Sequence, residues 1–200
     1  MKAFIRTITV FAGLLFTAVG CGSSSNGEFV RELKLERDVA GIFAEHIRQQ
    51  TNGDGPILVL VSPNLGPRLQ KTQTERLQGL RSKLGADRVI PVDVAAEDDP
   101  RLYMVDNDYL PRDLLLETLS RHPDSAAVIS LIGFPHNSSG AGLGVSLYLY
   151  GVTHQALAWQ AMDSGWASAV LYSRGVDDQP PRRRADLSGE MLASYTLEVR

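Results

Sequence analysis

The sequence predicts an α/β protein, a three-layer αβα sandwich whose mostly parallel sheet has about four parallel strands and a C-terminal, antiparallel edge strand. Residues 57–62 form an apolar, β-branched-rich run without polar alternation, which is typical of a strand buried on both faces. Segments of helical periodicity separate this run from further apolar runs, the order that gives parallel strands joined by right-handed crossovers. Residues 191–199 alternate in polarity, which indicates a strand at an edge.

The N-terminal residues are set apart from this fold. Lys2 and Arg6 precede an apolar stretch at 8–19, the pattern of a signal peptide, and that stretch is short for a permanent membrane span. We therefore predict a signal peptide at 1–20, a lipidated cysteine with a flexible tether at 21–27, and a single α/β domain at 28–200.

Residues 17–21, TAVGC, resemble the lipobox of bacterial lipoproteins. The resemblance implies that the thiol of Cys21 receives a diacylglycerol and that cleavage makes Cys21 the N-terminus, so that the lipid bilayer is a partner. Gly22, which is not acidic, implies outer-membrane sorting in a Gram-negative source. The expected localisation is the cell envelope, facing the periplasm or the exterior. The alternative is an ordinary secretory signal, or an uncleaved helix, with an incidental cysteine.

Cysteine count and charge exclude two further classes. Cys21 is the only cysteine, so the domain is expected to be stabilised by its core without a disulfide. Loss of Lys2 and Arg6 would change the formal charge from −3 to −5. This acidic balance argues against a nucleic-acid partner.

The first half of the domain shows clear element boundaries. Residues 28–50 carry a stripe at helical spacing that includes Phe29, Leu33, Glu36 and Phe43 and gives the helix one apolar face. Pro67 suits the first turn of a helix at 67–84, which Gly85 is placed to end. Residues 88–94 form a second strand, and Pro91 predicts that it lies at or near a sheet edge because proline cannot donate to the ladder.

The second half of the domain is also predicted to contain helices and strands. An acidic loop at 95–109 precedes a short helix at 110–121 and a buried strand at 126–132. Residues 145–149 alternate like a strand, but the residues after them have helical spacing, so we expect a helix at 151–164. A fourth strand is expected at 169–173.

This construction resembles one lobe of a type I periplasmic sugar-binding protein, or the flavodoxin-like architecture, over residues 56–175. The resemblance rests on the pattern of elements. A complete binding protein of that class has two lobes, and this chain is too short for the second.

Ligands of open α/β sheets collect beyond the carboxyl ends of the strands, where the strand order reverses. If the strands at 57–62 and 126–132 flank that point, their two following loops meet there, and each leads toward a helix start with free N–H groups. The alternative is that these residues only form turns. The candidate ligand-binding residues are Ser62, Asn64, Gly66, Gly133, His136, Asn137 and Ser138.

Other motifs give little support for chemistry. The glycines at 140–144 lack the spacing of a dinucleotide fingerprint, and residues 106–108 lack the rest of a calcium loop. Ser62 has no nucleophile elbow around it. We therefore expect no cofactor, no metal and no catalytic residue.

The preferred interpretation is a non-catalytic, membrane-anchored extracytoplasmic lipoprotein that binds a small polar ligand or an envelope protein. One alternative is a cell-envelope hydrolase or transferase that uses Ser62 and His136. For that alternative, His136 or His154 should lie within hydrogen-bond reach of Ser62 or of a carboxylate. A third is a structural lipoprotein that pairs with a partner through its C-terminal edge strand.

Overall fold

The computed structural model describes residues 24–51, 55–63, 65–96, 98–105, 108–136, 138–140, 143–173 and 195–199. The predicted signal peptide, Cys21, Asn64 and Asn137 lie outside these residues. The chain divides into two compact units, Met1–Leu35 and Glu36–Arg200. The sheet and every site considered below belong to the second unit.

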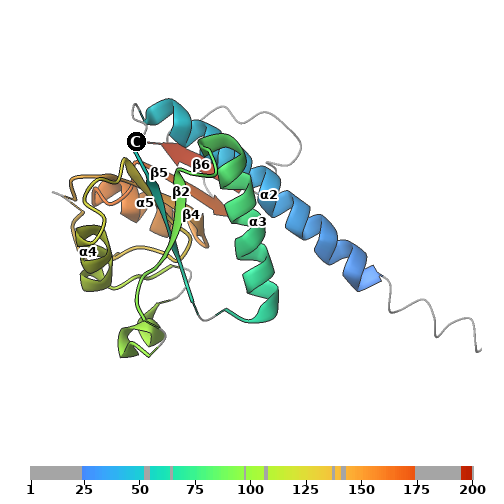
Figure 1. Cartoon of the computed structure of the whole chain (residues 1–200), viewed down its shortest axis with the longest axis horizontal. Coiled ribbons are helices and arrows are strands. Elements are labelled where there is room, and N and C mark those ends of the chain that lie inside the picture. The colour runs from blue at the N-terminus through green and yellow to red at the C-terminus, as the bar shows by residue number, and fades with distance from the viewer. Residues whose placement is uncertain are drawn as a thin grey trace, which may run out of the picture. The chain divides into compact units, whose positions relative to one another are not determined.

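The second unit is built on one six-stranded sheet with the order β2-β1-β3-β4-β5-β6 (Figure 1). The strands are β1 (Ile57–Val61), β2 (Val89–Asp93), β3 (Ala127–Ser130), β4 (Ser146–Val152), β5 (Ala169–Ser173) and β6 (Tyr195–Val199). Neighbours are parallel except for β5 and β6, which are antiparallel. The predicted fold class is confirmed, with β2 at one edge and the antiparallel strand at the other.

Strand β4 raises the number of parallel strands to five, one more than the sequence predicts. It ends at Val152, so the helix expected from residue 151 begins only at Gln155. Leu147 and Leu149 pack into the core on one face, while Tyr148 and Tyr150 are buried on the other. Burial on both faces outweighs the helical spacing of the residues that follow.

The helices cover both faces of the sheet. They are α2 (Ser24–Gln50), α3 (Pro67–Leu84), the 3₁₀ helix η1 (Pro100–Met104), α4 (Arg112–Ser120) and α5 (Gln155–Asp163). Four residues expected in the tether, 24–27, belong to α2 instead. Gly27 does not end the helix, because a glycine costs a helix only about 1 kcal/mol relative to alanine.

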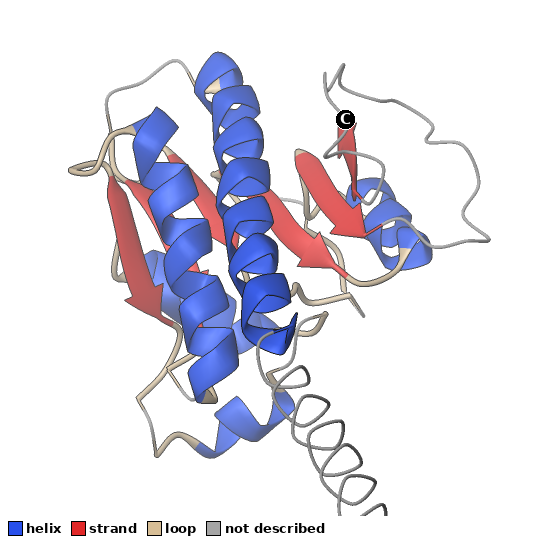
Figure 2. Ribbon diagram, turned by 90° about the vertical axis from the view of Figure 1, so that its right-hand side faces the viewer, coloured by secondary structure: helices blue, strands red, loops and turns tan. Residues whose placement is uncertain are grey.

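One face of the sheet is covered by α3 and by the part of α2 from Glu36 onward, which lie side by side (Figure 2). Phe43 of α2 meets Tyr150 of β4 edge to face, with 5.6 Å between ring centroids. The two helices approach so closely that a Cβ on Gly79 would lie 2.2 Å from the carbonyl oxygen of Arg37. The opposite face packs on α4 and α5 in a continuous core that includes Leu58, Leu60, Leu114, Val128 and Ala158.

The connection from β3 to β4, residues 131–145, has no helix in its described part. It instead runs along α5. The Gln160 side chain donates to the carbonyl of His136, and the Trp166 indole donates to the carbonyl of Ser138 at 2.7 Å. The expected alternation of strand and helix is therefore wrong at this position.

Across the described part of the chain, no helix combines the length and the apolar character that crossing a bilayer requires.

Candidate functional site

The strand order reverses at β1. The chain passes from β1 to β2 on one side of it and returns to β3 on the other, so β1 pairs with both. Because parallel strands end at the same edge, the segments that follow β1 and β3 leave from neighbouring positions. The predicted placement of these two strands is confirmed, and we call this edge of the sheet the carboxyl edge.

The segment after β1 leads directly into α3. Ser62 follows the strand, and Gly66 is the N-cap of α3 with extended backbone angles and no side-chain cap. Pro67 occupies the first turn, and the carbonyl of Gly66 accepts from the amide of Gln70 at 2.9 Å. Ser62 is half-buried and Gly66 is exposed. Both are open to a ligand from solvent.

The segment after β3 contacts residues 108–109, which come from the connection between β2 and α4. Tyr109 forms a parallel β-bridge with Phe134, and the amide of Phe134 donates to the carbonyl of Asp108 at 3.3 Å. Gly133 has φ of +93°, and a Cβ there would lie 2.3 Å from the carbonyl carbon of Asp108. The glycine that we predicted to contact a ligand is thus required by the close approach of residues 108–109.

His136 packs against the two residues of this β-bridge, Tyr109 and Phe134. Its ring meets Tyr109 at 4.9 Å and Phe134 at 5.7 Å between centroids, both edge to face. The backbone amide of His136 donates to the carbonyl of Phe134 at 3.0 Å. The half-buried imidazole is therefore held by aromatic packing at the carboxyl edge.

Asp108 ties this crossing to the end of β4. Its carboxylate accepts from the amide of Thr153 at 2.9 Å and from the Thr153 hydroxyl. Thr153 lies between β4 and α5, two residues before the helix begins. The carboxylate therefore fixes residues 108–110 beside the ends of both β3 and β4.

Ser138 lies two residues beyond His136, and its hydroxyl donates to the carbonyl of Pro135 at 3.1 Å. Its carbonyl accepts from the indole of Trp166, and the amide of the nearby Gly140 donates to the carbonyl of Ser164 at 3.0 Å. Ser164 and Trp166 follow the C-terminal end of α5 and lead into β5, at the opposite edge of the sheet. The structure therefore brings Ser62, Gly66, Gly133 and His136 to the carboxyl edge, and Ser138 lies where the connection turns away from His136 toward Trp166.

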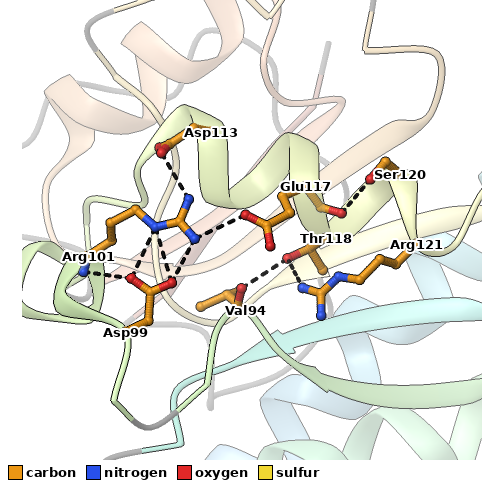
Figure 3. A network of polar contacts seen from close by, with 8 residues as sticks. All are labelled: Val94, Asp99, Arg101, Asp113, Glu117, Thr118, Ser120 and Arg121. Carbon is orange, nitrogen blue, oxygen red and sulfur yellow. Dashed lines mark hydrogen bonds and ion pairs between the residues drawn. The ribbon is translucent and has the colours of Figure 1, made fainter.

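The acidic segment between β2 and α4 is held by one guanidinium (Figure 3). Arg101 forms ion pairs with Asp99 at 2.7 Å, with Asp113 of α4 at 3.1 Å and with Glu117 of α4 at 3.0 Å. Hydrogen bonds from Arg101 lower the pKa of the Asp99 and Asp113 carboxyls. Among the described residues there is no group of three metal-ligating side chains.

A buried ion pair lies on the α2–α3 face, toward the carboxyl edge. Glu36 of α2 accepts from the Nε of Arg76 at 2.8 Å, from the Tyr150 hydroxyl at 3.2 Å and from the Tyr195 hydroxyl at 3.1 Å. The Arg76 guanidinium lies 4.9 Å from the centroid of the Tyr150 ring. We call Glu36, Arg76, Tyr150 and Tyr195 the Glu36 cluster.

Electrostatics in the Glu36 cluster favour the ion pair. Burial raises the pKa of the Glu36 carboxyl, but the hydrogen bonds and charge of Arg76 and the two tyrosine hydroxyls outweigh it, so the pKa is lowered overall. Burial raises the pKa of the Tyr150 phenol, which stays neutral. The cluster joins α2, α3, β4 and β6. The sequence signal for it is a glutamate in the apolar stripe of a helix, which does not reveal its partners.

The geometry required by the hydrolase alternative is not present among the described side chains. Within them, neither the His136 nor the His154 ring forms a hydrogen bond to Ser62 or to a carboxylate.

The three central side chains of β6, Thr196, Leu197 and Glu198, are buried. Glu198 accepts from the indole of Trp159 at 2.8 Å.

No protein-family model and no curated protein matches the sequence. Several solved structures are similar to part of the chain. A solute-binding protein from Burkholderia graminis in complex with D-arabinose has 13% identity and a TM-score of 0.46, over 68% of this chain and 47% of that one. A carbohydrate-transporter solute-binding protein from Agrobacterium radiobacter, also with D-arabinose, has 10% identity and a TM-score of 0.45, over 70% and 47%.

A third is an arabinose-binding protein from Geobacillus stearothermophilus, with 17% identity and a TM-score of 0.40 over 68% of this chain and 45% of that one. The matched part spans less than half the length of each of these proteins.

Proposed function

We propose that this protein is a lipid-anchored, extracytoplasmic, non-catalytic domain that holds a small polar ligand at the carboxyl edge of its sheet. The observation that carries the proposal is the reversal of strand order at β1, which sets the segments after β1 and β3 side by side. In open α/β sheets this position collects ligands, because backbone N–H groups at the following helix start face it.

The groups available at this edge suit hydrogen bonding. Ser62 supplies a hydroxyl, the uncapped start of α3 supplies backbone N–H groups, and His136 supplies an imidazole set against Tyr109. These groups bind without any covalent step. Gly133 serves the ligand only indirectly, by letting residues 108–109 pass beneath His136.

A thermal-shift screen against sugars, nucleotides, peptides and metal ions tests the binding proposal. A ligand that binds only the folded state raises stability by mass action, by about 2.7 kcal/mol at a concentration of 100 Kd. We expect Asn64→Ala and His136→Ala to fold normally and to reduce this gain. His122→Ala is the matched control and should leave the gain unchanged, because His122 lies between α4 and the start of β3, at the other end of the strands. Loss of folding in the first two variants without any ligand effect would assign both residues a structural role.

The anchor has its own test. We expect Cys21→Ser to release the protein from the membrane fraction and to remove the acyl mass, because the resemblance to a lipobox implies that the Cys21 thiol carries the lipid. Fractionation and intact-mass spectrometry of the wild-type chain and the variant measure both. Unchanged fractionation would contradict the anchor and leave the binding proposal standing.

A further inference from the structure

The opposite edge of the sheet holds a cavity of about 330 Å³. Its lining comes from His46 and Gln50 at the end of α2, Ser146 and Tyr148 of β4, Ser168 just before β5, and Val199 at the end of β6. Because β6 is antiparallel, its last residue, Val199, pairs with Ala169 at the start of β5, and Ala169 pairs with Tyr148 of β4 on its other side. The cavity therefore belongs to the amino edge of the parallel strands, away from Ser62 and His136.

The fold leaves room for a cavity here. A helix is about 10 Å wide and strands lie about 4.8 Å apart, so two helices side by side cover about four strands. The sheet has six strands, and α2 and α3 lie over the β2, β1, β3 and β4 side of their face (Figure 2). The cavity lies where the covering by α2 ends, next to β5 and β6.

The lining side chains that the structure describes are polar, apart from Val199, and none of them carries a charge. They include two serine hydroxyls, one amide, one imidazole and one phenol. Burial lowers the pKa of the His46 imidazole, which is therefore neutral at pH 7. Burial also raises the pKa of the Tyr148 phenol, against a smaller opposing effect of the Ser146 hydroxyl, so the phenol keeps its proton. Every one of these groups donates or accepts hydrogen bonds without carrying charge.

Two walls of the cavity, formed by β4 and the start of β5, are held in place. Tyr148 is only 2% exposed, and its ring meets Phe43 edge to face at 6.4 Å between centroids. The amide of Ser168 donates to the carbonyl of Leu147 at 2.8 Å, which fixes the start of β5 against β4. A cavity with walls fixed in this way loses little entropy when it takes up a ligand.

We propose that this amino-edge cavity is a second binding site, which takes a neutral, polyhydroxylated small molecule of monosaccharide size. The volume lies at the lower end of the range for small-molecule sites, about 300–1,000 Å³. A charged ligand would lose its hydration without gaining a counter-charge from the lining, whereas a neutral polyol exchanges its hydrogen bonds with water for hydrogen bonds with the lining. The site is independent of the carboxyl-edge proposal.

The test compares three probes that share one ring but differ in charge: D-glucose, D-glucuronate and D-glucosamine, with myo-inositol as a second neutral polyol. Calorimetric titration uses the full chain in a zwitterionic detergent, because detergents with sugar headgroups would compete. We expect saturable binding of at least one neutral probe at millimolar concentration or below, and at least tenfold weaker binding of the two charged probes.

Variants locate the site. We expect Tyr148→Phe, which removes only the hydroxyl, to weaken binding of the neutral probe about tenfold, and Ser146→Trp to abolish it by filling the cavity. Gln50→Ala should weaken it, whereas Gln49→Ala, an exposed neighbour outside the lining, should not. Circular dichroism checks that each variant folds, and Gln50→Ala tests the site even if a strand variant does not fold.

Three results would overturn the proposal: no binding of either neutral probe, equal binding of the charged probes, or binding unaffected by Gln50→Ala and Tyr148→Phe. Weakening by His136→Ala in place of these variants would assign the probe to the carboxyl edge. That outcome supports the proposed function and refutes the second site.

Discussion

The two edges of the sheet differ in how the protein uses them. At the carboxyl edge the chain packs against itself, with residues 108–110 bridged to Phe134, Asp108 bonded to Thr153, and the Glu36 cluster nearby. At the amino edge the lining residues surround a cavity of about 330 Å³. Strand order thus determines where loops gather, but side-chain volume and chain crossings determine where space remains.

The largest expected effect comes from the Glu36 cluster. Arg76→Ala leaves the Glu36 carboxylate buried without its counter-charge, so we expect a loss of about 3–5 kcal/mol in the free energy of unfolding. Arg37→Ala is the matched control, because Arg37 pairs with Glu75 from a side chain that is 49% exposed. Its loss should stay below about 1 kcal/mol. Urea denaturation measures both losses. Equal losses would contradict the claim that the buried Glu36–Arg76 pair contributes more to stability than the exposed Arg37–Glu75 pair.

A smaller effect is expected at Gly133. Gly133→Ala combines left-handed backbone with a collision against Asp108, so we expect a loss of about 2–4 kcal/mol. Gly144 near the amino edge also has positive φ, +76°, but a Cβ there meets nothing within 4 Å. Gly144→Ala should therefore cost only the backbone strain.

That strain is about 1–2 kcal/mol, a smaller loss than the one expected for Gly133→Ala. Thermal denaturation measures the loss of stability in each alanine variant. The difference between the two losses gives the contribution of the close contact between Gly133 and Asp108 at the carboxyl edge. Equal losses would mean that residues 108–109 do not constrain Gly133.

The sequence predicts the fold well because strand burial leaves a clear pattern. The unbroken apolar run of β1 and the proline in β2 correctly predict a strand buried on both faces and an edge strand, although β1 lies next to the edge and not at the centre of the sheet. Strand β4 is less clear, because Gly151 ends its alternation and a helix-like spacing follows. The missing helix before β4 has no local signal, because the connection is stabilised by contacts with α5 that are distant in sequence.

The candidate site is predicted less completely, because it also depends on contacts between residues that are distant in sequence. Ser62 and His136 follow strands, so topology alone brings them to one edge. The crossing of residues 108–110 depends on a bridge to Phe134, and the amino-edge cavity on side chains from four elements. Neither arrangement has a local sequence pattern.

The most direct test of the central claim is amide chemical-shift mapping of the protein with a ligand from the thermal-shift screen. We expect saturable shifts at Ser62, Leu65 and His136, because the reversal of strand order at β1 places their segments together. Shifts confined to the amino edge, or to surfaces away from both edges, would contradict a binding role for the carboxyl edge.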